Sequence, residues 1–141
     1  MQIKEVQTRE EIAATFLVLR QIYENLNEAT YVDDVLNQMQ RGYKMAAVFE
    51  DFGPCIGVIG IRIVRKLQHG KVIEVEDFMI DRARRGVGVG KMLIRFLEWQ
   101  ATIFNCKTII GSLETKRQES QKIFSREKFL LDGLFFKKTY E

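Results

Sequence analysis

The sequence contains little proline, cysteine or histidine: one, two and one residue, respectively, among 141. With a single proline and no biased tract, a long linker or a disordered tail is not expected. Cys55 and Cys106 lie far apart in the chain. We therefore expect two free, buried thiols in a reducing compartment, and neither a disulfide framework nor a zinc site. The lone His69 sits in a predicted turn and is assigned no role. No metal site is predicted.

Long hydrophobic runs are also missing. No apolar segment is long enough to cross a bilayer, and residues 1–6 lack the apolar stretch of a secretory signal. We therefore expect a cytoplasmic protein with no membrane partner. The length of 141 residues is typical of one domain and allows a stable core, so residues 1–141 are expected to form a single domain.

An excess of charge of one sign is absent as well. The 22 basic and 19 acidic residues leave a net charge of +3, which does not predict a nucleic-acid partner. The charges are clustered, however, with an acidic group followed by a basic one. The two groups are Glu74, Glu76 and Asp77, then Arg82, Arg84, Arg85 and Lys91. This order indicates an anion site beside a site for a cation or an amine.

Alternation and helical periodicity predict elements in the order β-α-α-β-β-β-α-β-α-β-β. The expected strands cover residues 3–6, 44–50, 55–65, 71–80, 108–113, 129–131 and 134–140. The expected helices cover residues 8–25, 31–39, a long segment from 88 onward, and 118–128. The strand–helix–strand passage between residues 71 and 113 implies at least one parallel pair in a mixed α/β sheet.

The most informative segment is residues 73–91, where a strand is followed by an arginine-rich loop and by alternate glycines that open a helix. The first N–H groups of a helix have no partner within it, and the helix dipole favours an anion there. Glycines let a ligand approach the main chain, and one glycine would suffice for a plain turn. The three glycines are Gly86, Gly88 and Gly90. The segment therefore predicts a phosphate site.

Two common phosphate-binding patterns do not fit this loop. A P-loop requires Ser or Thr after Gly-Lys, but Met92 follows Lys91. A dinucleotide fingerprint requires G-x-G-x-x-G, and no glycine stands at position 91. The remaining pattern, Arg-x-x-Gly-x-Gly, is met by Arg85, Gly88 and Gly90.

The strand, the loop over residues 85–90 and the following helix resemble the pyrophosphate-binding motif of the GNAT superfamily of acyl-CoA-dependent N-acyltransferases. The order of elements is similar to that fold over nearly the whole chain. The resemblance implies a mostly antiparallel mixed sheet, with about four helices and a parallel strand pair that splays around coenzyme A. It also implies transfer of an acetyl group from acetyl-CoA to a primary amine of a small molecule or peptide, and a possible homodimer.

The resemblance assigns the cofactor site residue by residue. The pantetheine arm would pair with main-chain groups of Phe78, Met79 and Ile80. The diphosphate would bind the loop residues Arg84, Arg85, Gly86, Val87, Gly88, Val89, Gly90 and Lys91.

The reaction needs a base, because a free amine is mostly protonated at neutral pH. In family members that use a strand glutamate, that residue lies six before the position of Ile80, which is Glu74. Strand alternation places Glu76 and Phe78 on the same face as Glu74, with Asp77 on the other. Glu74 and Glu76 are therefore the candidate bases, and Asp77 is expected to be structural.

Alternatively, the two glutamates cover an exposed strand face or pair with Arg62 or Lys71. Many family members also have a tyrosine on the last helix that protonates the departing thiolate. Phe124 stands there in this chain and would line the cofactor site without donating a proton.

Other positions depart from the family pattern too. Arg117 replaces the usual asparagine and Lys128 the usual glycine. Ser125 is a weak substitute for the acid, since it points about 100° around the helix from Phe124. The missing acid motivates a second hypothesis, a non-catalytic acyl-CoA-binding module. The acidic cluster motivates a third, a protein-lysine or N-terminal acetyltransferase. The acceptor is expected near residues 23–34, where the polar candidates are Tyr23, Asn25, Tyr31, Asp33 and Asp34.

Overall fold

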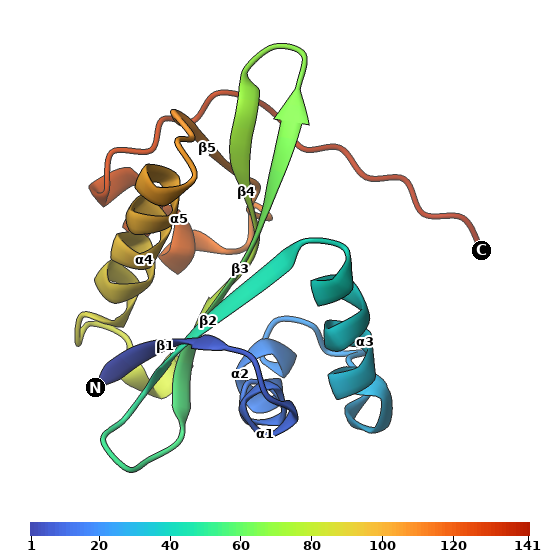
Figure 1. Ribbon diagram of the computed structural model, residues 1–141, viewed down its shortest axis with the longest axis vertical. Helices are drawn as coiled ribbons and strands as arrows, with labels where there is room; N and C mark the ends of the chain where they lie inside the picture. Colours follow the sequence, from blue (N-terminus) through green and yellow to red (C-terminus); the bar gives the residue numbers. More distant parts are fainter.

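The computed structural model describes residues 1–141 and contains a five-stranded sheet with helices on both faces (Figure 1). The strands are β1 (Gln2–Val6), β2 (Tyr43–Phe49), β3 (Cys55–Lys66), β4 (Gly70–Ile80) and β5 (Thr108–Gly111). The helices are α1 (Arg9–Ala14), α2 (Phe16–Arg20), α3 (Glu28–Gln40), α4 (Val89–Ile103) and α5 (Gln118–Arg126), with a short 3-10 turn η1 (Arg82–Arg84). No helix has the length and apolar character needed to span a bilayer.

The sheet order is β1-β2-β3-β4-β5, and only the last pair is parallel. That pairing is short: it joins residues 72–75 of β4 to residues 108–111 of β5. Strand β4 then continues to Ile80 with no strand on that side. The predicted mixed α/β sheet, mostly antiparallel with one parallel pair that separates, is confirmed.

Two buried clusters hold the helices to the sheet. Helices α1, α2 and α3 cover one face, and α4 and α5 cover the other (Figure 1). On α4, Leu93, Ile94 and Leu97 are completely buried against the strands. Burying one such side chain stabilises the fold by about 1.5–3 kcal/mol. Cys55 and Cys106 are free and buried, as predicted.

The predicted helix over residues 8–25 is interrupted. It opens at a capping box formed by Thr8 and Glu11 and stops at Thr15, where α1 gives way to α2. The Thr15 hydroxyl lies 2.7 Å from the Ile12 carbonyl oxygen and 2.6 Å from the Tyr31 hydroxyl. Such local bonds compete with helix continuation, and propensity does not reveal them.

Helix α3 begins earlier than the expected start at residue 31. Asn27 caps it, because its side chain accepts a hydrogen bond from the Ala29 amide at 2.9 Å. The helix therefore starts at Glu28, which adds an acidic side chain to its first turn, where the helix dipole favours negative charge.

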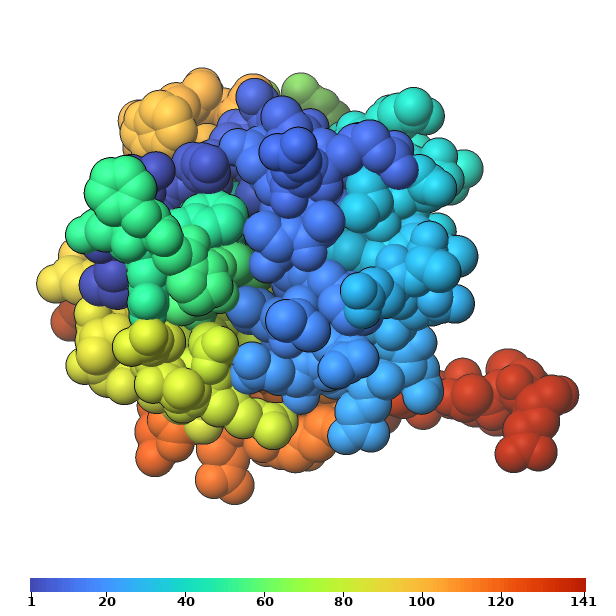
Figure 2. Space-filling view, turned by 90° about the horizontal axis from the view of Figure 1, so that it is seen from below, coloured from blue at the N-terminus to red at the C-terminus, as the bar shows by residue number.

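The predicted strands over residues 129–131 and 134–140 are wrong. Residues 129–141 form no regular structure, and their outer part projects away from the other elements (Figures 1 and 2). Only Phe129 packs inward, stacked on Phe124 at 4.8 Å. A two-stranded hairpin is marginal alone, and these apolar side chains find no surface to dock on. The exposed ones are Leu130, Leu131, Leu134, Phe135, Phe136 and Tyr140.

The two environments of leucine give a direct test of this core. Leu93, a residue of α4, is fully buried, whereas Leu130 is 89% exposed. Leu93→Ala should lower the free energy of unfolding by about 2–5 kcal/mol, because it removes buried methyl groups and leaves a cavity. Leu130→Ala should change it by less than about 0.5 kcal/mol. Urea denaturation followed by circular dichroism measures both, and a large loss in the Leu130 variant would contradict the exposed C-terminal segment.

Candidate active site

A β-bulge in β4 determines which side chains reach each face of the sheet. Gly60 of β3 is opposite Asp77, but the next residue, Ile61, is opposite Val75. Glu76 is therefore an extra residue on β4. A bulge of this kind reverses the alternation of every side chain that follows it.

The bulge corrects the predicted facing of two residues, Asp77 and Phe78. Glu74 and Glu76 share one face, but Asp77 lies on that same side, with α1, α2 and α3. Phe78 points to the opposite side, into the cluster under α4 and α5, where its ring meets Phe124. The prediction that Phe78 faces the same way as the two glutamates is wrong, because plain alternation does not anticipate the inserted residue.

Asp77 is held by two tyrosines. The Tyr23 hydroxyl donates to one of its carboxylate oxygens at 2.5 Å, and the Tyr43 hydroxyl donates to the other at 2.6 Å. Burial, reinforced by the Asp77 carboxylate, raises the pKa of both phenols above the ordinary value. Both therefore stay protonated and donate over the physiological range. Sequence reasoning missed Tyr43, whose role depends on a strand register.

Gly60 makes this arrangement possible. A Cβ at Gly60 would lie 1.9 Å from the Tyr43 hydroxyl oxygen. The ring of Tyr43 thus crosses β3 at the one position where no side chain blocks its path to Asp77.

Both candidate bases already have cationic partners. Glu76 pairs with Arg62 at 2.7 Å, and Arg62 also donates to the Arg41 carbonyl oxygen at 2.7 Å and to Gln38 at 2.8 Å. Glu74 pairs with Lys66 at 2.7 Å, a partner on β3 other than the predicted Lys71. The pairing alternative from the sequence is therefore present for Glu76 with Arg62.

A small cleft, here called the β4–β5 cleft, opens where β5 ends and β4 continues. It is lined by Val75, Glu76, Phe78, Gly111, Ser112, Leu113, Arg117 and Phe124. The structure thus brings together Glu76, Phe78 and Phe124 from the predicted site, while Glu74 lies outside the cleft.

Helix α5 supplies one wall of this cleft. Phe124 is buried, with its ring 5.0 Å from that of Phe78, and a Cβ at Gly111 would meet it at 2.7 Å. Two turns earlier, the Arg117 guanidinium donates to the Phe78 carbonyl oxygen and, at 3.1 Å, to the Ser120 hydroxyl. Burial lowers the pKa of Arg117 from its ordinary value, but a guanidinium remains protonated at neutral pH.

The glycine loop over residues 84–91 leads from β4 into α4. Gly86 and Gly88 have φ values of 84° and 91°, the left-handed region that favours glycine. Gly88 is the N-cap of α4 and offers no side chain, so the first-turn amides stay open to a ligand. Gly90 serves packing: a Cβ there would lie 3.0 Å from Ile123 and 3.1 Å from Ile80.

The arginines of this loop differ in what they contact. Arg84 pairs with Glu50, and Arg82 donates to the Gln21 carbonyl oxygen at 3.0 Å, which ties the loop to the end of α2. Arg85 and Lys91 form no salt bridge. These two remain the available cations for an anionic ligand.

Of the five polar candidates for the acceptor, only Tyr23 reaches the site. Tyr31 is buried on Thr15, and Asp33 lies on the outside of α3, paired with Arg9 at 2.9 Å. Asn25 and Asp34 are exposed.

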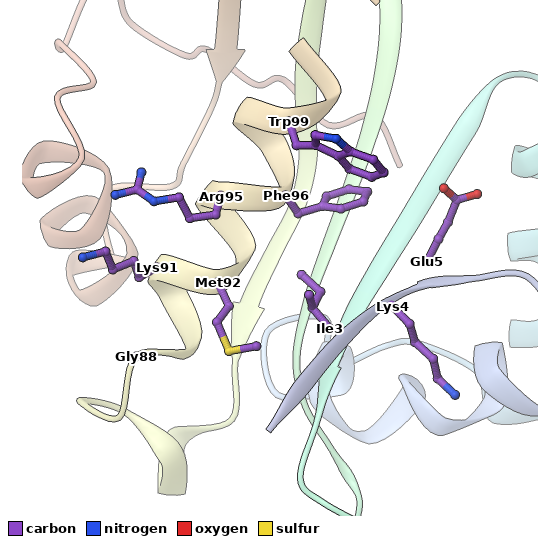
Figure 3. A pocket seen from close by; sticks show the side chains of 9 residues that line it. All are labelled: Ile3, Lys4, Glu5, Gly88, Lys91, Met92, Arg95, Phe96 and Trp99. Atoms are coloured by element: carbon purple, nitrogen blue, oxygen red, sulfur yellow. The ribbon is translucent and has the colours of Figure 1, made fainter. Parts of the chain in front are cut away.

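A larger hollow of about 620 Å³ lies between β1 and α4, at the opposite end of the sheet from the β4–β5 cleft (Figure 3). It touches the glycine loop at Gly88 and Lys91. Its other lining residues are Ile3, Lys4, Glu5, Met92, Arg95, Phe96 and Trp99. No group of three or more His, Cys, Asp or Glu side chains is placed to hold a metal ion.

These features define a class of α/β protein that has a cleft between diverging parallel strands and a glycine loop at a helix start, where unpaired amides can accept an anion. The model of the acetyltransferase (GNAT) family matches residues 8–126, which is most of the sequence. The chain belongs to the GNAT family of acetyltransferases. Among curated protein sequences, none matches the chain significantly.

Solved structures with the same fold include three with informative names. An acetyltransferase from Trypanosoma brucei is 19% identical, with a TM-score of 0.79 and coverage of 99% of this chain and 100% of the other. A ribosomal-protein-alanine N-acetyltransferase from Brucella melitensis biovar Abortus 2308 is 14% identical, with a TM-score of 0.83 and the same coverage. AAC(6')-Iy, in complex with the bisubstrate analog CoA-S-monomethyl-acetylneamine, is 17% identical, with a TM-score of 0.80 and the same coverage.

The passage of Tyr43 over Gly60 can be tested by adding one methyl group. Gly60→Ala should push the Tyr43 ring off Asp77, leaving the carboxylate with one phenol and lowering stability by about 1–3 kcal/mol. Gly133→Ala is the matched control, because nothing lies within 4 Å of the added Cβ. Urea denaturation of both variants compares them, and equal stabilities would show that Tyr43 does not take this path.

Proposed function

We propose that the protein transfers an acetyl group from acetyl-CoA to a primary amine, by direct attack of the amine on the thioester. The observation that carries this proposal is the glycine loop at the start of α4, which follows directly on β4, the strand that forms one side of the β4–β5 cleft. The diphosphate of the cofactor would accept hydrogen bonds from the open amides, with Arg85 and Lys91 as counter-charges. The pantetheine arm would then run along residues 78–80 of β4, whose free side has no neighbouring strand.

The acetyl group would reach the inner end of this path, where Glu76 lines the cleft. We infer that Glu76 is the base that takes a proton from the attacking amine, directly or through a water molecule. Glu74 is the second candidate, but it lies outside the cleft and holds Lys66. The carboxylate of Asp77, fixed by two phenols, adds negative charge on the side of the sheet where an amine would enter.

The acceptor is proposed to be a cationic amine of a small molecule or a peptide. Three carboxylates gather on one face of β4, and a protonated amine is attracted by such a group before it loses its proton. Two of the structural neighbours are named for amine substrates, the alanine of a ribosomal protein and an aminoglycoside analog linked to CoA. The free, buried cysteines fit a reducing compartment such as the cytoplasm.

A non-catalytic acyl-CoA-binding module is the second candidate, favoured by the absence of a hydroxyl on Phe124. Release of free thiol from acetyl-CoA with a panel of polyamines, aminoglycosides and peptides distinguishes the two. Tight CoA binding without thiol release would support the module.

Cofactor binding is tested at Gly88. Gly88→Glu should reduce CoA affinity at least about tenfold, because a carboxylate would crowd and repel the diphosphate. Gly70→Glu is the matched control: Gly70 has a similar φ of 70°, equal free space and a place in the distant β3–β4 turn. Calorimetry with CoA measures both. Unchanged affinity in the Gly88 variant would mean that the loop does not hold the diphosphate.

The identity of the base is tested by pH–rate profiles. Glu76→Gln should lower kcat by about 10²–10⁴-fold at neutral pH, and by less at high pH where the amine is already neutral. Glu74→Gln should have a smaller effect. If Glu74→Gln lowered kcat more than Glu76→Gln, the base would be Glu74. If neither variant changed the pH–rate profile, both glutamates would be excluded as the base.

A further inference from the structure

The β4–β5 cleft has no tyrosine at the position from which many family members protonate the leaving thiolate. When the thioester breaks, negative charge forms on the sulfur of CoA, and Phe124 has no hydroxyl to protonate it. Arg117, the N-cap residue of α5, lines the same cleft. Both Arg117 and Phe124 line the cleft, so the guanidinium lies near the place where the departing sulfur would form.

The environment of Arg117 is unusual for an arginine of this protein. It is half-buried, and its two hydrogen bonds go to uncharged oxygens, those of Phe78 and Ser120. By contrast, Arg62 and Arg84 are each paired directly with a glutamate. A guanidinium has five N–H donors, so Arg117 keeps donors to spare.

The charged and titratable groups that act on Arg117 come from several elements. The ones that influence it electrostatically are Tyr23, Asp77, Arg85 and Glu114, and Glu76 lines the same cleft. None of them forms a direct ion pair with it, so the positive charge is held at the cleft without being neutralised by contact. The hydrogen bond to the Phe78 carbonyl, at the inner end of the proposed pantetheine path, fixes the position of the Arg117 guanidinium.

We propose that Arg117 stabilises the thiolate of CoA as it leaves, and so replaces protonation by charge compensation. In this step the lone pair of the neutral amine forms the C–N bond, and the C–S bond breaks with its electron pair on sulfur. The amine proton passes to the carboxylate base and then to water, while sulfur departs as an anion held by the guanidinium. This role rests on the proposed function, because it requires CoA in the cleft.

The first test uses the unaltered protein and two ligands, CoA and desulfo-CoA, which lacks the thiol. A cation beside the sulfur lowers the pKa of the bound thiol below the ordinary value of about 8.5. Between pH 7 and pH 9, CoA affinity should therefore rise about tenfold relative to that of desulfo-CoA. Calorimetry at several pH values gives both affinities.

The two failures are distinguishable. If neither ligand binds, the proposed function fails. If both bind with the same pH dependence, the role of Arg117 is overturned and the cofactor site stands.

The second test is a set of variants. Arg117→Gln should lower kcat about 10- to 100-fold and remove the difference in pH dependence between the two ligands. Arg126→Gln on α5 is the control, since the Arg126 side chain is 63% exposed and its one ion pair, with Glu127, is long at 3.9 Å. Both should retain the folded circular dichroism spectrum, and Arg117→Lys, which keeps the charge, serves if the glutamine variant unfolds.

Rescue separates thiolate stabilisation from a merely structural role. Phe124→Tyr in the Arg117→Gln background should recover about tenfold in kcat, because the new hydroxyl supplies the proton that the cation had made unnecessary. The recovered activity should fall above about pH 10, where the phenol ionises. An unchanged kcat in Arg117→Gln, or a lowered kcat that Phe124→Tyr does not restore, would overturn the proposal.

Discussion

The site depends on one constraint, the early end of the parallel pairing between β4 and β5. The ladder stops at Val75 and Gly111, yet β4 runs on to Ile80 with its backbone groups facing an empty side. Backbone groups away from water need partners, and here the Phe78 carbonyl takes one from the guanidinium of Arg117. The separation opens the β4–β5 cleft between the two strands. The proposed cofactor would pair with the free backbone of β4 and place its diphosphate on the loop that starts α4.

The bulge at Glu76 divides this site into two sides. It turns Asp77 toward Tyr23 and Tyr43, and Phe78 toward Phe124. The polar side faces α1, α2 and α3, and the aromatic side faces α5. An amine and a thioester would therefore approach the strand from opposite faces, which suits direct transfer between them.

The distribution of ion pairs shows which charges are free to act. Arg62, Lys66 and Arg84 are each bound to a glutamate, whereas Arg85, Lys91 and Arg117 are not. Arg85 and Lys91 belong to the glycine loop and Arg117 lines the cleft, so three of the chain's unpaired cations lie at the candidate site. An exposed ion pair adds little stability, but an unpaired, half-buried cation lowers the energy of an anion placed next to it. The positive charge of the protein is thus available where a phosphorylated thioester would place its negative groups.

The sequence by itself determined the features that are local: strand and helix periods, the capping box at Thr8 and the glycine loop that opens α4. The sequence also showed the resemblance to the GNAT family, because the glycine loop and the order of elements can be recognised without knowing any long-range contact. Only the tertiary structure decided the break at Thr15, the bulge that turns Asp77 inward, the unpaired residues 129–141 and the lining of the cleft by Glu76 and Arg117. The break, the bulge and the lining each depend on a residue far along the chain, such as Tyr31 for Thr15 or Gly60 for Asp77, whereas residues 129–141 have no such partner. Local periodicity does not reveal such a partner. A strand with one inserted residue still reads as a strand in the sequence, but every side chain after the insertion points to the opposite face.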